Sequence, residues 1–370
     1  MKNMMKLLTN VFFILLLLIC TTSCTNSDKK TFHNSYNDDL SSFDNRSLMN
    51  NVSVSPIRDF IIGGALNPAL YYPEYKSCLD MVDNLFNLVV DEGRMNWKIS
   101  EPVQGKVNFF AYLKSATWVK EHNKTMRNHN LFWTNPDEIP SWAKELSNQE
   151  LRQAMSDRIS YVASKGSDIT SLDVINEMIV YDYFRTRLGN GIIKDIYAET
   201  KLALPLAKLY INENPYHVCT LKQCNISSKE EYKEFVIDKF LDFLDNLSDE
   251  GVIYDGIGLQ AHFTDSAMIS NKPFNYTNED HIIIYDELIT KIYEKTGKKV
   301  LITEFDFESN NETKRANFIS DFYTMALNHP YTEGIIYWSW LTPVNKAIVD
   351  YDCKLNSAGQ AYLNAISSVK

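Results

Sequence analysis

Cysteine is scarce in this sequence, and its cysteines and histidines do not cluster. Six cysteines are spread over 370 residues, without a Cys-x-x-Cys pair or a histidine–cysteine group of the zinc-binding kind. The sequence therefore gives no indication of a zinc site, and we expect neither a metal nor another cofactor. Cys219 and Cys224 are close enough to bridge a loop, whereas Cys78 and Cys353 have no local partner. Spacing alone establishes no disulfide.

Net positive charge and phosphate-binding loops are also lacking. Lys and Arg number 37 against 47 Asp and Glu, which gives a net charge of −10. Because nucleic-acid binding requires a basic surface, we expect no nucleic-acid partner. The segment Ile62-Gly63-Gly64-Ala65 does not have the glycine spacing of a dinucleotide-binding loop. A neutral substrate would meet no electrostatic penalty at such an acidic surface.

A long hydrophobic run occurs only near the N-terminus. Lys2 and Lys6 precede the apolar run 11–20, which is too short to span a bilayer. We expect residues 1–23 to be a signal peptide, because 21–24 resembles the end of a bacterial lipoprotein signal with Cys24 as the lipidated residue. Thr21 stands where such signals usually have leucine. The expected location is lipid-anchored at the bacterial cell envelope, with a secreted or periplasmic protein as the alternative.

The remaining chain divides into a polar segment and one large domain. Residues 24–56 are rich in Ser, Asn and Asp and predict a flexible tether. In residues 57–370, short apolar runs alternate with segments of helical spacing, which predicts a single α/β domain, a (β/α)₈ TIM barrel. A monomer is the default expectation, since nothing in the sequence indicates the oligomeric state. An open doubly wound sheet is the alternative. The eight predicted strands are Phe60–Leu66, Leu85–Val90, Met126–Trp133, Ser171–Glu177, Lys208–Asn212, Tyr254–Gln260, Lys299–Phe305 and Gly334–Trp340.

Helix starts are indicated by pairs of serine and glutamate three residues apart. Ser147 with Glu150, and Ser227 with Glu230, have the spacing of a capping box, in which each residue satisfies a free backbone N–H of the first turn. Gly297 stands where a helix ending near Thr296 would place its C-terminal cap.

Two predicted strands end in a glutamate. The runs 172–177 and 300–304 are apolar until they reach Glu177 and Glu304. In barrels of this type the chemistry lies at the carboxyl ends of the strands, and two carboxylates there can flank one glycosidic bond. Either glutamate alone could be a solvated loop residue. Their occurrence together with further polar and aromatic strand-end residues favours a sugar-cleaving site: Glu92, His129, Trp133, Asn176, Asn212, Gln260, His262, Asp306, Trp338 and Trp340.

Several of these segments resemble glycoside hydrolase family 10, the endo-β-1,4-xylanases. The resemblance begins near Phe60 and continues to the C-terminus. It is carried by Asp173-Val174-Ile175-Asn176-Glu177, by Ile302-Thr303-Glu304-Phe305-Asp306, by Asp255-Gly256-Ile257-Gly258-Leu259-Gln260-Ala261-His262, and by His129-Asn130-Leu131-Phe132-Trp133, in the order usual for the family.

The resemblance implies a role for each matching residue. Glu177 would be the general acid and then the base, and Glu304 the nucleophile, of a retaining, endo-acting enzyme on xylan, in which the two carboxyl groups stand about 5–5.5 Å apart. Asn176 would bond the 2-hydroxyl of the sugar being cleaved. The expected supporting residues are His262, Asp306, Gln260 and His129, and the expected substrate contacts are Glu92, Trp133, Trp338 and Asn96. Trp338 and Trp340 alternate, so we expect one of the two to belong to the core.

The sequence departs from the family where substrate binding is expected. Gly93 and Asn96 stand where the second strand's motif usually has asparagine and lysine, and a second tryptophan expected after the last strand is missing near 345–348. Recognition of the sugars on the glycone side would therefore differ. Three alternatives follow: a glycosidase acting on another β-linked plant or algal glycan, a surface glycan-binding protein with weak catalysis, and a Mg²⁺-dependent barrel enzyme of the enolase type.

Overall fold

The computed structural model describes residues 60–165, 169–218, 226–265 and 277–368. The chain divides into residues 1–44 and 45–370, and all described residues belong to the second part. The predicted signal peptide, the lipidated Cys24, the tether and a Cys219–Cys224 bridge lie outside the described residues. Within them, no helix combines the length and apolar character needed to cross a membrane.

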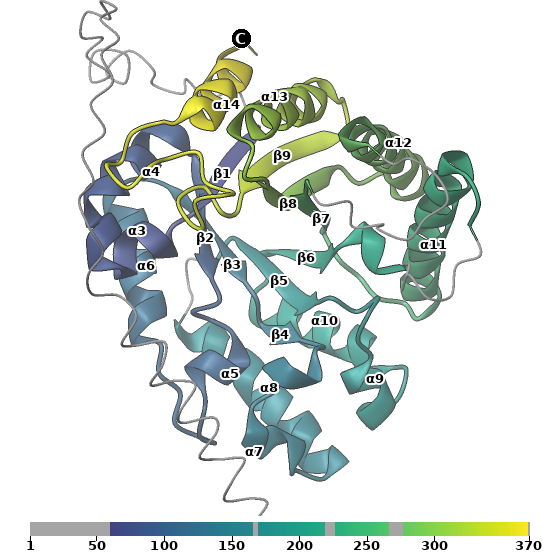
Figure 1. The fold of residues 1–370 in the computed structure, drawn as a ribbon. Helices are drawn as coiled ribbons and strands as arrows, with labels where there is room; N and C mark the ends of the chain where they lie inside the picture. The colour runs from purple at the N-terminus through teal and green to yellow at the C-terminus, as the bar shows by residue number, and fades with distance from the viewer. Residues whose placement is uncertain (1–59, 166–168, 219–225, 266–276, 369–370) are drawn as a thin grey trace, which may run out of the picture. The chain divides into compact units, whose positions relative to one another are not determined.

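A closed parallel barrel forms the centre of the described domain (Figure 1). Neighbouring strands pair in parallel all the way round, and the β1–β9 and β3–β5 pairings close the ring. Closure confirms the (β/α)₈ barrel and excludes the open sheet. The strands are β1 (Ile61–Ala65), β2 (Leu88–Glu92), β3 (Thr125–His129), β5 (Ser171–Asn176), β6 (Lys208–Glu213), β7 (Gly256–Thr264), β8 (Val300–Glu308) and β9 (Thr332–Tyr337), with β4 (Phe132–Trp133) following β3 and pairing with β5.

The helices pack around the outside of this barrel (Figure 1). Their apolar sides and the outward side chains of the strands form the main core, as expected when strands alternate with amphipathic helices. The helices are α3 (Asn67–Tyr71), α4 (Leu79–Leu85), α5 (Trp97–Ser100), α6 (Phe110–Glu121), α7 (Ser141–Lys144), α8 (Asn148–Lys165), α9 (Tyr183–Leu188), α10 (Ile192–Ala203), α11 (Lys229–Asp249), α12 (Asn278–Thr296), α13 (Glu312–Asn328) and α14 (Ser357–Ser368), with short 3₁₀ turns η1 (Pro73–Cys78), η2 (Pro136–Glu138) and η3 (Pro215–Val218).

Two of the three predicted helix ends are confirmed. Ser147 and Glu150 form the capping box that begins α8, and Gly297 ends α12 in the left-handed conformation, with φ of 68°. The cap of α11 was predicted one residue too early. Ser228 is the N-cap, and its side chain accepts the backbone N–H of Glu231. Two adjacent serines followed by adjacent glutamates make both registers plausible in the sequence.

A second, smaller apolar cluster fills the inside of the barrel. It consists of Leu88, Val90, Tyr210, Leu301 and Ile336. The ring of Tyr210 fits there only because the neighbouring strand carries Gly256: a Cβ at that position would lie 2.2 Å from the Tyr210 ring. Away from the carboxyl ends of the strands, the inside of the barrel is thus a packed apolar core. Polar side chains occupy its carboxyl end.

Two contacts join distant parts of the chain. Cys78 in η1 and Cys353 in the segment before α14 form a disulfide with their Cα atoms 5.1 Å apart, across 275 residues of sequence. Trp340 is fully buried against Phe86, and its indole N–H donates to the carbonyl of Ala65. The prediction that one of the two C-terminal tryptophans is core is therefore confirmed.

Candidate active site

A cleft of about 680 Å³ lies at the carboxyl ends of the barrel strands. It brings together most of the residues predicted from the sequence, namely Glu92, His129, Trp133, Asn176, Glu177, Gln260, His262, Glu304 and Trp338. Among its other lining residues, Asn67, Tyr72, Arg94, Asn214 and His217 were not predicted. They belong to loops and helix starts after the strands, where periodicity gives no information about orientation.

Glu304 is buried in β8 and surrounded by donors. The amide of Asn212 donates to its Oε1 at 2.6 Å, and Nε2 of His262 lies 3.0 Å from its Oε2. The Nδ1 of His129 lies 3.7 Å from Oε1. Burial alone would raise the pKa of Glu304, but these two histidines and the Asn212 hydrogen bond outweigh it and lower the pKa below its usual value. Glu304 is therefore an ionised carboxylate at neutral pH.

His262 is held between two carboxylates. Its second ring nitrogen, Nδ1, lies 3.2 Å from Asp306, which also accepts a hydrogen bond from the Ser339 hydroxyl at 2.8 Å. Burial opposes charge on the ring, but Asp306 and Glu304 outweigh burial and raise the pKa of His262 to about 10. The imidazole is thus a cation next to Glu304, and Asp306 lies on its other side.

A second histidine–carboxylate pair supports Glu304 from the other side. Nδ1 of His129 lies 3.0 Å from Asp173, and Asp173 is also paired with Arg127 inside the barrel. Although burial lowers the pKa of His129, Glu304 and Asp173 raise it overall. No role of its own was predicted for Asp173. The β5–β6 pairing shifts register between Asp173 and Ile175, so simple alternation does not predict that Asp173 and Asn176 both have partners inside the barrel.

Glu177 follows β5 directly and adopts a left-handed backbone conformation, with φ of 58°. Its two carboxylate oxygens accept hydrogen bonds from neutral groups, the Trp133 indole at 2.8 Å and the Gln260 amide at 3.2 Å. The next turn is held by Glu213, whose buried carboxyl group accepts the backbone N–H groups of Met178 at 2.6 Å and Ile179 at 3.2 Å. Since a non-glycine residue with positive φ needs support from its surroundings, Glu213 positions Glu177.

Asn176 connects the two glutamates. Its side-chain oxygen accepts from Asn212 at 2.9 Å and from Gln260 at 3.4 Å, and these same amides donate to Glu304 and Glu177 respectively. The amide nitrogen of Asn176 is buried and has no partner among the described residues. It can therefore donate to a ligand hydroxyl next to both carboxylates.

Two further residues predicted to contact substrate, Trp338 and Asn96, differ in whether they reach the cleft. Trp338 lines the cleft and meets the ring of His129 edge to face, with 5.3 Å between the ring centres. Asn96, by contrast, does not line the cleft. It is buried as the N-cap of α5, where its side-chain oxygen accepts the N–H groups of Lys98 at 2.9 Å and Ile99 at 3.4 Å. A residue in this position serves the local backbone, as N-cap asparagines commonly do.

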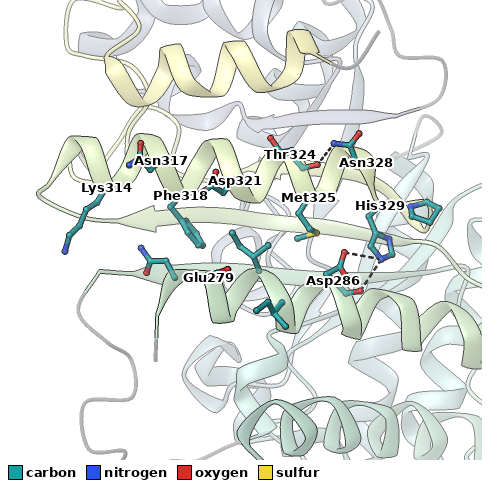
Figure 2. Close-up of a pocket in the computed structure, with 14 residues that line it drawn as sticks. Glu279, Asp286, Lys314, Asn317, Phe318, Asp321, Thr324, Met325, Asn328 and His329 are labelled. Carbon is teal, nitrogen blue, oxygen red and sulfur yellow. Dashed lines mark hydrogen bonds and ion pairs between the residues drawn. The ribbon is translucent and has the colours of Figure 1, made fainter. Parts of the chain in front are cut away.

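The described residues contain another cavity, of about 930 Å³, outside the barrel between α12 and α13 (Figure 2). Two of its polar residues bond to neighbouring backbone: the Asn328 amide donates to the Thr324 carbonyl, and His329 contacts Asp286. No glutamate from a strand end faces it. Within the described residues, no group of three or more His, Cys, Asp or Glu is placed to hold a metal ion. The cleft at the strand ends is therefore the candidate active site.

The fold and this cleft define a (β/α)₈ barrel with two glutamates converging at its carboxyl end. Residues 57–343 match the family profile "Glycosyl hydrolase family 10", and the chain belongs to this family. Among curated proteins, it is 26% identical over 303 residues to Anti-sigma-I factor RsgI6 of Acetivibrio thermocellus, covering 80% of this chain and 35% of that protein. It is 25% identical over 294 residues to Endo-1,4-beta-xylanase 2 of Arabidopsis thaliana, covering 77% and 25%. The chain thus spans about a quarter to a third of these relatives.

Solved structures share the fold. The crystal structure of xylanase 10B from Thermotoga petrophila RKU-1 in complex with xylobiose matches with a TM-score of 0.66 and 20% identity, covering 84% of this chain and 94% of that one. A GH10 endoxylanase retrieved from a sugarcane soil metagenome matches with a TM-score of 0.67 at 20% identity, covering 84% and 97%.

Proposed function

We propose that this protein is a retaining, endo-acting glycoside hydrolase that cleaves β-1,4-xylosidic bonds. The observation that carries the proposal is the contrast around the two glutamates. Glu304 is kept ionised by two histidines, whereas both donors to Glu177 are neutral. A nucleophilic carboxylate and a proton donor on opposite sides of one bond are what double displacement requires.

In the first step, the Glu304 carboxylate attacks the anomeric carbon while Glu177 gives its proton to the departing sugar oxygen. The C–O bond to the leaving group breaks, and a glycosyl ester on Glu304 forms. In the second step, Glu177 takes a proton from water, and the water oxygen displaces Glu304 from the sugar. The unpartnered amide N–H of Asn176 would bond the adjacent hydroxyl throughout.

Xylan is the proposed substrate because several relatives are named as xylanases and a structural neighbour was solved with xylobiose. The cleft residues are suited to a neutral sugar: amides and carboxylates can bond hydroxyls, and the indoles of Trp133 and Trp338 can contact the apolar faces of sugar rings. We further propose that the protein is exported and acts as a lipid-anchored monomer at the cell envelope, on the basis of the segment ending at Cys24.

The test is reducing-sugar release from linear xylan, glucuronoarabinoxylan, mixed-linkage glucan and carboxymethylcellulose by the wild type, Glu177→Ala and Glu304→Ala. Xylan should be cleaved by the wild type, and loss of the nucleophile should reduce the rate by more than about 10⁴-fold. Chain-length analysis of the products checks internal cleavage. Folded wild-type protein that releases no sugar from any polymer would overturn the proposal.

A glycan-binding protein with weak catalysis is the second candidate. It is favoured by one observation, that Asn96 is occupied as a helix cap and does not reach the cleft where the family usually has a substrate-binding lysine. Calorimetry with xylo-oligosaccharides separates the two candidates, since tight binding without turnover would support the second.

A further inference from the structure

Arg94 is a cation in the cleft without a counter-ion. It follows β2 in the loop that lines the cleft next to Glu92 and Gly93. Its guanidinium lies over the ring of Tyr71, 4.5 Å from the ring centre, and this stacking fixes its orientation. Although an arginine is always charged, Arg94 makes no hydrogen bond or ion pair with the described residues, and its Nε is buried without a partner.

A second unpartnered polar group lies at the same end of the cleft. Asn67 is 3% exposed and lines the cleft, and its amide N–H donates to the backbone carbonyl of Glu92. Its side-chain oxygen is buried and has no partner among the described residues. Because buried polar groups are normally hydrogen-bonded, two unpartnered groups among the lining residues of one cleft point to a ligand there.

The neighbouring acids Asp91 and Glu92 form no ion pair with Arg94, although its charge lowers the pKa of both. Burial raises the pKa of both Asp91 and Glu92 to about 7, so at neutral pH a large fraction of each is uncharged. Neither carboxylate approaches the guanidinium closely enough to form an ion pair. Arg94 therefore keeps the positive charge available to whatever enters the cleft.

Space and an aromatic surface are present next to this cation. Gly93 has a φ of 72°, and a Cβ added there would meet only the Ile99 side chain, at 3.6 Å, so the volume above it is open. Tyr72 lines the same region with 48% of its surface exposed. Tyr72 therefore offers a sugar ring an aromatic surface within the cleft that Arg94 and Asn67 also line.

We propose that this end of the cleft is a subsite for a sugar that carries a carboxylate, a uronic acid, which pairs with Arg94. The planar fork of the guanidinium matches a carboxylate with two parallel hydrogen bonds, and the free oxygen of Asn67 accepts a hydroxyl of the same sugar. The inference rests on the proposed function in that the occupant is part of the glycan in this cleft. It adds that the substrate is an acidic, uronic-acid-substituted xylan.

The experiment compares linear xylo-oligosaccharides with the same oligosaccharides carrying glucuronic acid on each sugar in turn. The readout is the ratio of kcat/KM on the acidic to that on the neutral substrate, for the wild type, Arg94→Gln, Arg94→Lys and a control, Lys106→Gln. Lys106 is an exposed cation that does not line the cleft. We expect the ratio to fall about 10- to 100-fold in Arg94→Gln, as for the loss of a charge-assisted pair, and to be partly kept in Arg94→Lys. Lys106→Gln should leave it unchanged.

An unchanged ratio in Arg94→Gln, or an equal fall on both substrates, would overturn the subsite. If the wild type cleaves neither substrate, the proposed hydrolase function fails, and the subsite is then tested separately by binding. Calorimetry on Glu304→Gln and on Glu304→Gln/Arg94→Gln should give at least about tenfold weaker binding of the acidic oligosaccharide to the double variant. Equal affinities would overturn the inference. Thermal melts establish that each variant is folded.

Discussion

Strands β8 and β2 each bring a glutamate to the cleft, yet the two carboxyl groups differ in charge. Burial raises the pKa of both. Glu304 has the Asn212 amide and two histidines as neighbours, and its pKa is lowered. The Glu92 side chain accepts no hydrogen bond from the described residues, and its pKa rises to about 7. The neighbouring groups, and not the depth of burial, therefore decide the charge of each carboxyl group. The protein itself supplies the hydrogen-bond partners of Glu304, whereas the end of the cleft at Glu92 is left for a ligand.

Removing His262 should raise the pKa of Glu304 and so bring it closer to that of Glu92. In His262→Ala we expect kcat to fall by about 100-fold or more, because His262 stabilises the negative charge that returns to Glu304 when water displaces it from the sugar. The acidic limb of the pH–rate profile should move to higher pH, because the pKa of Glu304 rises. The measurement is kcat/KM from pH 4 to 9, on the order of one point per half unit, and superimposable profiles would contradict the comparison.

Stability gives a second readout of the same substitution. His262 has a folded pKa of about 10, above the ordinary 6.5, so its stabilisation is complete below about pH 6.5 and is lost as pH rises toward 10. Urea unfolding should show this loss in the wild type and less of it in His262→Ala. His122→Ala, at a surface histidine outside the cleft, is the matched control.

Glu213 extends the comparison of Glu304 and Glu92 to a third buried glutamate, whose hydrogen-bond partners are backbone N–H groups. In Glu213→Ala the N–H groups of Met178 and Ile179 lose their acceptor, at a cost of about 1–3 kcal/mol each, and Glu177 shifts. We expect kcat to fall about 10- to 100-fold with little change in KM, since misplacement of a catalytic group by about 1 Å has effects of this size. Glu213→Gln keeps one acceptor oxygen and should recover part of kcat. Lower stability with an unchanged kcat would show that Glu213 is only structural.

Glu92→Gln tests the other end of the cleft, and its expected effect is on stability. The folded pKa of about 7 lies above the ordinary 4.5, so the folded state holds an extra proton between these values and stability falls as pH rises through them. The loss due to Glu92 should reach up to about 3 kcal/mol between pH 5 and 8, and Glu92→Gln should remove it. Asp91 contributes in the same direction, so the difference between wild type and variant in urea unfolding is the quantity to compare. Equal pH dependence in both proteins would contradict the assignment.

All eight strands of the barrel were predictable, because each is a short apolar run between helical segments. The ends of the strands were less predictable than the strands themselves. Strands β7 and β8 continue to Thr264 and Glu308, several residues past the predicted ends. Their polar side chains interrupt the apolar pattern but face the cleft, where polarity is required. The same residues that end the pattern in the sequence are therefore those that form the site.

Residues outside the strands were predicted less well. Asn96 was expected to contact substrate but caps α5, because an asparagine before a helix start is also the best acceptor for its free N–H groups. Arg94 and Asn67 were missed, since nothing local marks a polar residue as unpartnered. That property depends on what other segments bring to the same place.

The sequence by itself determined the barrel and the two glutamates at strand ends, because hydrophobic periodicity is local and parallel strands gather their carboxyl ends at one edge. Only the tertiary structure decided which partners each carboxylate has, and hence its charge. It also decided that Cys78 pairs with Cys353 across 275 residues. Such choices depend on distances of a few ångströms between segments far apart in the chain, and electrostatic interactions in a buried site change steeply over those distances.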